Sequence, residues 1–179
     1  RESLEIMSKS VRRLTRIVRD LFLLVRTDAG ELPVRHERFY LDETISQTVQ
    51  SLRTLAADRG VRLVEEHDPD LIVRGDEDLV QRLIINLVEN AIKHTPRDGM
   101  VNVLTTSEGS SIRIDVQDSG AGVPPDLHQR IFERFVRADP TRGTGHQEGV
   151  NGSGAGLGLP IARWIAEAHG GRRGRDRSR

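Results

Sequence analysis

Residues 86–95 read Asn-Leu-Val-Glu-Asn-Ala-Ile-Lys-His-Thr, and this stretch decides how the rest of the chain is interpreted. In a helix that turns about 100° per residue, Asn86, Asn90 and Lys93 fall within a narrow arc. The opposite side is apolar and carries Val80, Leu83, Ile84, Leu87 and Ala91. Amide oxygens are hard ligands that suit Mg²⁺, and lysine offers a compact charge for phosphate. The helix is therefore expected to bind an anionic, metal-bearing ligand, with an ordinary exposed polar face as the alternative.

A first glycine cluster, Asp118-Ser119-Gly120-Ala121-Gly122, follows a segment in which Ile112, Ile114 and Val116 alternate with polar residues. This alternation predicts a strand that ends at Asp118. A carboxylate there can accept a hydrogen bond from an exocyclic amine, and the glycines allow the backbone to approach a flat ring. Taken alone, a simple Asp-Ser-Gly turn is the better interpretation of this cluster.

A second cluster, Gly152-Ser153-Gly154-Ala155-Gly156-Leu157-Gly158-Leu159, leads directly into a predicted helix. Unpaired amides and the positive end of the helix dipole attract phosphate at such a position. The cluster lacks the Lys-Ser/Thr of a Walker loop, and it follows a long loop instead of the strand that a Rossmann loop follows. It therefore predicts a phosphate site of another kind, with a flexible linker as the alternative.

Between the clusters lies Phe132-Glu133-Arg134-Phe135. The four segments, in this order over about 75 residues, resemble the N box, first glycine box, F box and second glycine box of sensor histidine kinases. Those enzymes belong to the GHKL ATPase superfamily. The resemblance implies a two-layer α/β sandwich of the Bergerat (GHKL) type, with ATP as the nucleotide and Mg²⁺ as the metal.

The resemblance also implies roles for individual residues. Asn90 matches the amide that coordinates the Mg²⁺ between the phosphates. Asn86 and Lys93 match the second N-box amide and a phosphate contact, and both are catalytic candidates. Asp118 matches the carboxylate that reads the adenine amino group. The glycine boxes supply the other nucleotide-binding candidates: Gly120, Gly122, Gly154, Gly156, Leu157, Gly158 and Leu159.

Two further catalytic candidates lie outside the amide arc. Glu89 flanks the amide arc, and an acid in this helix activates water in some relatives. Arg137 lies in the predicted lid, the long polar segment 134–155, and is a candidate to stabilise charge during phosphoryl transfer. A solvated loop arginine is an equally good interpretation of Arg137. In the family, Phe132 and Phe135 anchor the lid and face the phosphoacceptor domain, and ordinary core packing is the alternative.

Residues 1–27 show two interlocked heptad series, which predict an a/d seam suited to supercoiled helices. The series are Leu4, Val11, Val18 and Val25, and Met7, Leu14 and Leu21. Additional apolar residues widen this face and favour a four-helix bundle over a bare dimer: Ile6, Ile17, Phe22, Leu23 and Leu24. The arginines at positions 12, 13, 16 and 19 are interpreted as a solvated face. The segment 28–30, Asp-Ala-Gly, is expected to end the helix.

The resemblance implies that residues 1–30 are the second helix of a dimerisation and phosphoacceptor domain, followed by a catalytic domain at 31–171. None of the six histidines has the context of a phosphoacceptor, so we expect the acceptor histidine on another chain or on upstream sequence. The implied partners are a histidine-bearing dimerisation domain or a second kinase chain, and a response regulator. A homodimer or heteromer through residues 1–27 is expected.

The remaining elements follow from turn residues and hydrophobic periodicity. We expect a linker or edge strand at 33–40, helices at 42–60, 76–94 and 159–169, strands at 61–66 and 71–74, and a hairpin of 100–106 with 111–116. Asp42 and Asp76 are the expected N-caps, and a short helix is expected from Pro124 to Phe132. The tail 172–179 has no apolar residue and is expected to be disordered. Relatives continue with two strands at this point, so the last two strands of the sheet are expected to be missing.

Composition narrows the function further. The 27 basic and 27 acidic side chains cancel, so there is no general attraction to nucleic acid, and no nucleic-acid partner is expected. The chain has no Cys and no stretch suited to a membrane span or a secretory signal. We expect a cytoplasmic location, either free or as part of a membrane-bound sensor. The alternatives to a histidine kinase are a GHKL-type ATPase and a non-catalytic dimerising module weakened by its short C-terminus.

Overall fold

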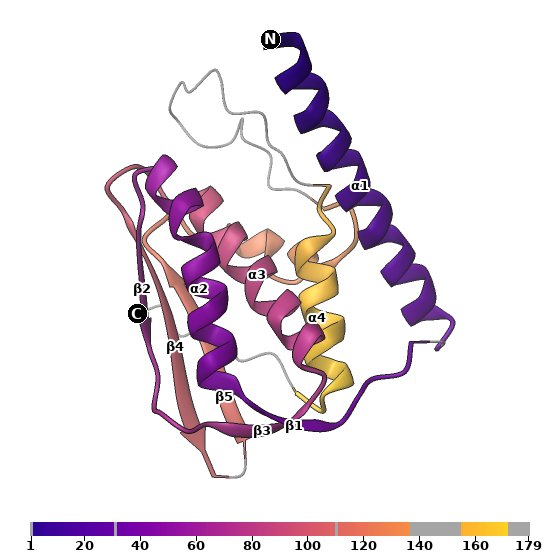
Figure 1. Ribbon diagram of the computed structural model, residues 1–179, viewed down its shortest axis with the longest axis vertical. Coiled ribbons are helices and arrows are strands. Elements are labelled where there is room, and N and C mark those ends of the chain that lie inside the picture. The colour runs from indigo at the N-terminus through magenta and orange to yellow at the C-terminus, as the bar shows by residue number, and fades with distance from the viewer. Residues whose placement is uncertain (1, 31, 110, 137–154, 172–179) are drawn as a thin grey trace.

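Figure 1 shows a computed structural model of the chain, which describes residues 2–30, 32–109, 111–136 and 155–171. The helices are α1 (Glu2–Asp28), α2 (Leu41–Asp58), α3 (Glu77–His94) and α4 (Gly158–Ala168). The strands are β1 (Glu37–Tyr40), β2 (Arg62–Glu66), β3 (Ile72–Gly75), β4 (Met100–Glu108) and β5 (Ser111–Asp118), and two 3₁₀ turns follow, η1 (Pro125–Leu127) and η2 (Arg130–Phe132). The expected tail, 172–179, lies outside the described residues.

The strands form a mixed sheet in the order β2-β4-β5 and a separate antiparallel pair, β1-β3. β2 runs parallel to β4, and β4 and β5 form the expected hairpin, with Val101 opposite Asp118 and Glu108 opposite Ser111. Helices α2 and α3 cover one face of the mixed sheet, α4 packs against α3, and α1 packs against α4 (Figure 1). The two-layer α/β sandwich expected from the sequence is confirmed.

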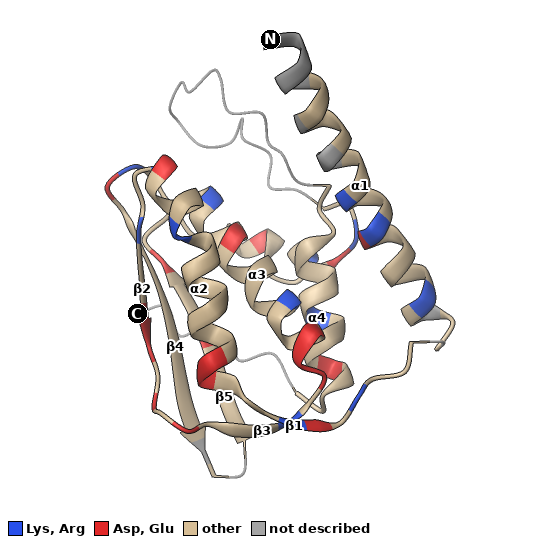
Figure 2. Cartoon of the chain, in the orientation of Figure 1, with Lys and Arg blue, Asp and Glu red and all other residues tan. Residues whose placement is uncertain are grey.

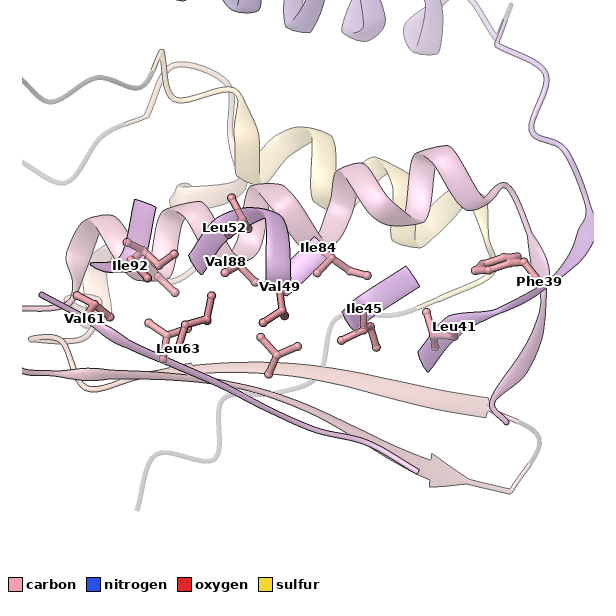
Figure 3. Packing of buried hydrophobic residues seen from close by; sticks show 14 residues of the cluster. Phe39, Leu41, Ile45, Val49, Leu52, Val61, Leu63, Ile84, Val88 and Ile92 are labelled. Atoms are coloured by element: carbon pink, nitrogen blue, oxygen red, sulfur yellow. The ribbon is translucent and has the colours of Figure 1, made fainter. Parts of the chain in front are cut away.

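The main core lies between the sheet and the apolar backs of α2 and α3, as Figure 3 shows in side view. Ile45 and Val49 of α2, Ile84 and Val88 of α3 and Val101 of β4 are fully shielded from solvent. Leucine, isoleucine and valine build most of this core, as the scarcity of aromatic residues requires. The two helices are therefore fixed to the sheet by side chains that point away from their polar fronts.

Two local expectations proved wrong. Asp42 does not cap α2, because Tyr40 occupies the N-cap position and Asp42 lies in the first turn of the helix. The Asp42 carboxylate accepts hydrogen bonds from the backbone N–H groups of Asp70 and Leu71 at 3.0 and 3.2 Å, so it orders the turn before β3 instead. The helix expected from Pro124 to Phe132 is replaced by the two separate 3₁₀ turns.

Helix α1 forms as expected and has two different apolar surfaces. Leu23 and Leu24 are buried in a second cluster with Leu157, Ile161 and Ile165 of the α4 region. These two residues therefore pack on the same chain and do not widen a bundle face. The heptad seam is exposed in this chain: Met7, Val11, Leu14, Val18, Leu21 and Val25. Among the described residues, no helix combines the length and apolar character needed to cross a bilayer.

Candidate nucleotide-binding site

The start of α3 is fixed by a buried carboxylate. Asp76 caps the helix as expected, because its Oδ1 accepts the Leu79 N–H at 3.3 Å. Arg35, in the linker before β1, donates its backbone N–H and Nε to Asp76 Oδ2, both at 3.2 Å. Burial alone would raise the pKa of Asp76, but the hydrogen bonds from Arg35 and Leu79 outweigh it and lower the pKa below its ordinary value. The linker is thereby tied to the helix that carries the polar front.

The front of α3 faces the beginning of α4 at Asn86. A methyl group placed on Gly158 would lie 3.5 Å from Asn86 Oδ1, so a larger residue would fill the space between them. Asn86 Nδ2 is buried and has no hydrogen-bond partner among the described residues. An unpaired buried amide is unfavourable by about 1–3 kcal/mol unless a ligand satisfies it. Asn86 and Gly158, both candidate site residues, therefore lie next to each other at a point where a polar ligand would be favoured.

The N-terminus of α4 adds backbone donors at the same place. Leu157 occupies the N-cap position and gives no side-chain cap, and the first turn contains no acidic residue. Pro160 has no N–H, while the N–H of Ile161 donates to the Leu157 carbonyl at 3.1 Å. Within the described part of the chain, no side chain therefore neutralises the positive end of this helix, which suits a phosphate site. The Leu157 side chain itself is buried, so its contribution to a ligand would come from its backbone.

The other end of α3 faces the loop after β5. A methyl group on Gly120 would lie 2.6 Å from the His94 carbonyl oxygen, so only glycine allows this approach. The Gly120 N–H donates to Asp118 Oδ1 at 2.8 Å, which orients the carboxylate. Asn86 and His94 are eight residues apart, which is about 12 Å along the helix. A ligand that touches both the Asp118 loop and the start of α4 must therefore be elongated.

The electrostatics at this end favour an uncharged imidazole. The pKa of His94 is lowered, first by burial and then by the positive charge of Lys93, with Asp118 opposing the shift. Asn90 and Lys93 are both half-buried on α3, between the two ends of the site. The predicted polar arc is therefore sheltered from solvent along its whole length.

The first residues of the predicted lid lie beside Gly156, the residue that follows it. The Phe135 N–H donates to the Gly156 carbonyl at 3.0 Å. Gly156 has φ +70°, and a methyl group there would lie 2.8 Å from the Val136 carbonyl oxygen. Phe135 is exposed and has φ +63°, an unfavourable backbone conformation for a bulky residue. The candidates Arg137 and Gly154 lie between these segments, outside the described residues.

Glu89 has a partner that the sequence did not reveal. Arg16 of α1 donates from Nη1 to Glu89 Oε2 at 2.8 Å and from Nη2 to Oε1 at 3.2 Å. Arg16 is exposed, as expected for a solvated face, but it also pairs with Glu89, which the sequence did not indicate. The remaining candidate, Gly122, has φ +73° and open space around its α-carbon, and Leu159 is half-buried in the first turn of α4.

One structural residue of the site was missed. His169, just after α4, accepts the Asp76 N–H at Nε2 at 2.9 Å and contacts the Ile165 carbonyl through Nδ1 at 2.8 Å. A methyl group on Gly75 would lie 2.6 Å from the His169 ring. The end of α4 is thereby joined to the start of α3. No sequence signal links residues this far apart, because the contact arises only when the two helices pack.

The donors present fit a magnesium ion held mainly by phosphates. Asn90 offers an amide oxygen on the same face as Asn86 and Lys93, and Mg²⁺ commonly takes few protein ligands and retains several waters. The described residues contain no group of three or more His, Asp or Glu side chains arranged to hold a metal by themselves. A single amide ligand is consistent with an ion that enters together with a nucleotide.

Comparison with known proteins assigns the fold to a family. The model of the histidine kinase-, DNA gyrase B- and HSP90-like ATPase family matches residues 75–178, more than half of the chain. The chain therefore belongs to this ATPase family. Within it, the chain is similar to the ATP-binding region of sensor histidine kinases.

Individual relatives agree with this assignment. The sensor protein IrlS of Burkholderia pseudomallei is 32% identical over 176 residues, which are 98% of this chain and 36% of IrlS. The chain thus spans about a third of that relative. The mycobacterial sensor histidine kinase MprB matches with a TM-score of 0.62 and 28% identity, over 75% of this chain and 80% of MprB. Full-length ShkA, solved with AMPPNP, matches with a TM-score of 0.72 and 26% identity, over 88% of this chain and 31% of ShkA.

Proposed function

We propose that the chain is the catalytic region of a cytoplasmic two-component histidine kinase. Residues 31–171 bind Mg-ATP, and residues 1–30 are the second helix of a dimerisation domain. The observation that carries the proposal is the amide nitrogen of Asn86 opposite Gly158, which has no hydrogen-bond partner in the described part of the chain, at a helix start that no described side chain caps. The AMPPNP bound in ShkA supports a nucleotide as the ligand.

The nucleotide would lie along the front of α3. Asp118 accepts a hydrogen bond from the adenine amino group, and Gly120 leaves room for the ring beside it. The phosphates run along the front of α3 towards the start of α4, with the Lys93 ammonium near one end of this path and the N–H groups of Gly158 and Leu159 at the other, and these groups balance their charge. Asn90 holds Mg²⁺, which when bound neutralises the phosphate oxygens. In this arrangement the protein contributes mainly positioning and electrostatic stabilisation.

The reaction transfers the γ-phosphoryl group to a histidine outside this chain. A nitrogen of that imidazole attacks the γ-phosphorus, the bond to the β–γ bridging oxygen breaks, and ADP leaves with the electron pair. Asn86, Lys93, Glu89 and the lid residue Arg137 are the proposed catalytic residues. The phosphoryl group then passes to an aspartate of a response regulator. The exposed heptad seam of α1 supports a homodimer or heteromer as the source of the histidine.

The first test is the binding of Mg-ATP to Asn90→Ala, measured by calorimetry. We expect at least a tenfold loss of affinity, equivalent to about 1.4 kcal/mol. Gln50→Ala is the matched control, because it removes an exposed amide from α2, the helix of equal length on the same sheet. Equal affinities for the two variants would contradict the assignment of Asn90 as the metal ligand.

A second test distinguishes the kinase from the two alternatives. The chain is incubated with γ-labelled ATP and a histidine-bearing dimerisation domain from a related sensor protein. Acid-labile label on that partner is expected for the kinase. Steady phosphate release without labelled partner would instead indicate a GHKL-type ATPase, and nucleotide-independent dimers with no ATP affinity would indicate a regulatory module.

A further inference from the structure

Helix α1 contacts α3 through two ion pairs of opposite polarity. In the first pair, the cation is Arg16 of α1 and the anion is Glu89 of α3, at 2.8 Å. In the second pair, one turn later on α1, the anion is Asp20 and the cation is Arg82 of α3, at 2.5 Å. The side chains of Asp20 and Glu89 are only 15% and 24% exposed. The earlier residue of α1 meets the later residue of α3, so the two helices run in opposite directions at this contact.

The opposed polarity selects a single register between the helices. If α1 slid by one turn, about 5.4 Å, Asp20 would take the place of Arg16 and its carboxylate would face Glu89. A slide in the other direction would bring Arg16 towards Arg82. Ion pairs at a protein surface each contribute only about 0.2–1 kcal/mol, but the neighbouring registers place like charges together. The pairs therefore determine the register in which α1 docks.

The same face of α1 continues into an apolar contact with the phosphate end of the site. Leu23 and Leu24 are buried against Leu157, Ile161 and Ile165, and Leu157 is the N-cap of α4. At about 100° per residue, this docking face and the exposed heptad seam lie roughly 150° apart around α1. Docking of the domain therefore leaves the seam free for another helix.

We propose that Arg16, Asp20, Arg82 and Glu89 form a charge latch that holds the ATP-binding domain on α1 in a resting pose. The regulatory part of this proposal rests on the proposed kinase function. In the latched pose both carboxylate oxygens of Glu89 accept from Arg16, so this carboxylate, one residue before Asn90, is withheld from an incoming nucleophile.

The two ion pairs of the latch are expected to separate together. Both α1 residues lie on one continuous helix, so a rotation of α1 by a helix bound at its seam would separate both pairs together. After release, Arg16 and Asp20 are four residues apart and can pair with each other. Opening therefore allows the two α1 residues of the latch to pair with each other. Figure 2 shows acidic and basic residues interspersed over the helices, so the specificity of the latch comes from the order of its charges and not from a single-sign patch.

The test of docking uses spin labels in the full chain. The chain has no Cys, so Thr15→Cys on α1 and Gln50→Cys on α2 provide two defined and exposed labelling positions. Distances are measured after dilution with an excess of unlabelled chain, which removes contributions between copies. One narrow distribution is expected for the otherwise wild-type chain. Arg82→Glu should broaden it, with a docking equilibrium reduced on the order of tenfold, and the exchange Asp20→Arg/Arg82→Asp should restore it.

The comparison of single and exchanged variants decides the outcome. A distribution for Arg82→Glu that matches the wild-type chain would overturn the latch, as would an exchanged variant as broad as the single one. Thermal melts of all variants in parallel separate release of α1 from loss of folding, because the core of the domain does not include these residues.

Phosphoryl transfer tests whether the docked pose is the resting one. Transfer of labelled phosphoryl to the histidine-bearing dimerisation domain should be several-fold faster with Arg82→Glu and should return to the wild-type rate in the exchanged variant. A slower rate with Arg82→Glu would show that the docked pose is the productive one and would overturn the resting assignment. If no variant binds Mg-ATP, the proposed function fails, while the distances still decide whether the latch exists.

Discussion

Helices α2 and α3 have the same length, 18 residues, and pack on the same sheet, yet their polar sides have different surroundings. The polar side of α2 is open to solvent: Glu43, Gln47, Gln50, Ser51, Arg53, Thr54 and Asp58 are exposed. In α3 every residue from 79 to 93 is buried or half-buried. The polar front of α3 is sheltered by α4 and α1, and polar groups in such a position need partners. The difference in exposure supports the proposal that the nucleotide-binding face lies on α3, the helix whose amides are shielded.

The apolar sides of α2 and α3 should contribute equally to stability, and truncating them has the largest expected effect. Ile45 of α2 and Ile84 of α3 are both fully buried in the same core. Truncation to Ala should lower the free energy of unfolding by about 3 kcal/mol in each case, through lost burial and a residual cavity. Urea unfolding of the two variants measures this. If only one variant lost stability, the two helices would not share one cooperative core.

The starts of the helices should differ. α3 begins with a buried carboxylate that caps it and binds Arg35, whereas α2 begins at Tyr40 with no side-chain cap. Asp76→Ala should therefore cost roughly 2 kcal/mol, measured by urea unfolding at neutral pH. Tyr40→Ala, the matched change at the start of α2, removes no cap bond and should cost less. A larger loss at Tyr40 would contradict the importance assigned to the Asp76 cap.

Asp76 also predicts a pH dependence with a definite sign. The folded state lowers the pKa of this carboxyl below its ordinary value of 3.8. Its contribution to stability is then complete above that value and is lost as the pH falls through the lower folded pKa, because the unfolded chain binds the proton first. Unfolding curves of the wild-type chain should weaken in this acidic window more than those of Asp76→Asn. Equal acid sensitivity would show that Asp76 is not ionised in the folded state.

The sequence predicted the features of the fold that depend on residues close together in the chain. The core backs of both helices follow from a 3.6-residue period, the β4–β5 hairpin from alternation around a glycine turn, and the Asp76 cap from its position before an apolar run. Asp42 failed as a cap because its carboxylate orders the turn at Asp70, a choice made by tertiary packing. Arg16 and Glu89, or Asp76 and His169, meet only after distant helices dock, and no periodicity specifies such pairs.

The fronts of the helices should respond with opposite signs to loss of an amide. Asn86→Ala removes a buried donor that has no partner among the described residues and introduces a better helix former. Stability should therefore rise by about 1 kcal/mol, while affinity for Mg-ATP should fall on the order of tenfold. Gln50→Ala on the exposed front of α2 should change neither quantity. Calorimetric titration and thermal melts of both variants measure the two effects. A loss of stability together with affinity would mean that Asn86 is a structural residue only.

The ends of the helices give the smallest expected effect. α3 carries Lys93 and His94 in its last turn, whereas the last turn of α2 has no basic residue. Burial and the Lys93 charge lower the pKa of His94 below its ordinary value of 6.5. The neutral ring is favoured in the folded state, so its contribution to stability is complete above pH 6.5 and declines as the pH falls through the lower folded pKa. Thermal melts should show a small loss of stability in the wild-type chain between neutral and mildly acidic pH, and a smaller loss in His94→Gln, which cannot gain a proton. Identical losses in the two proteins would mean that another group causes the loss of stability. The ends of α2 and α3 would then not differ in proton binding at mildly acidic pH.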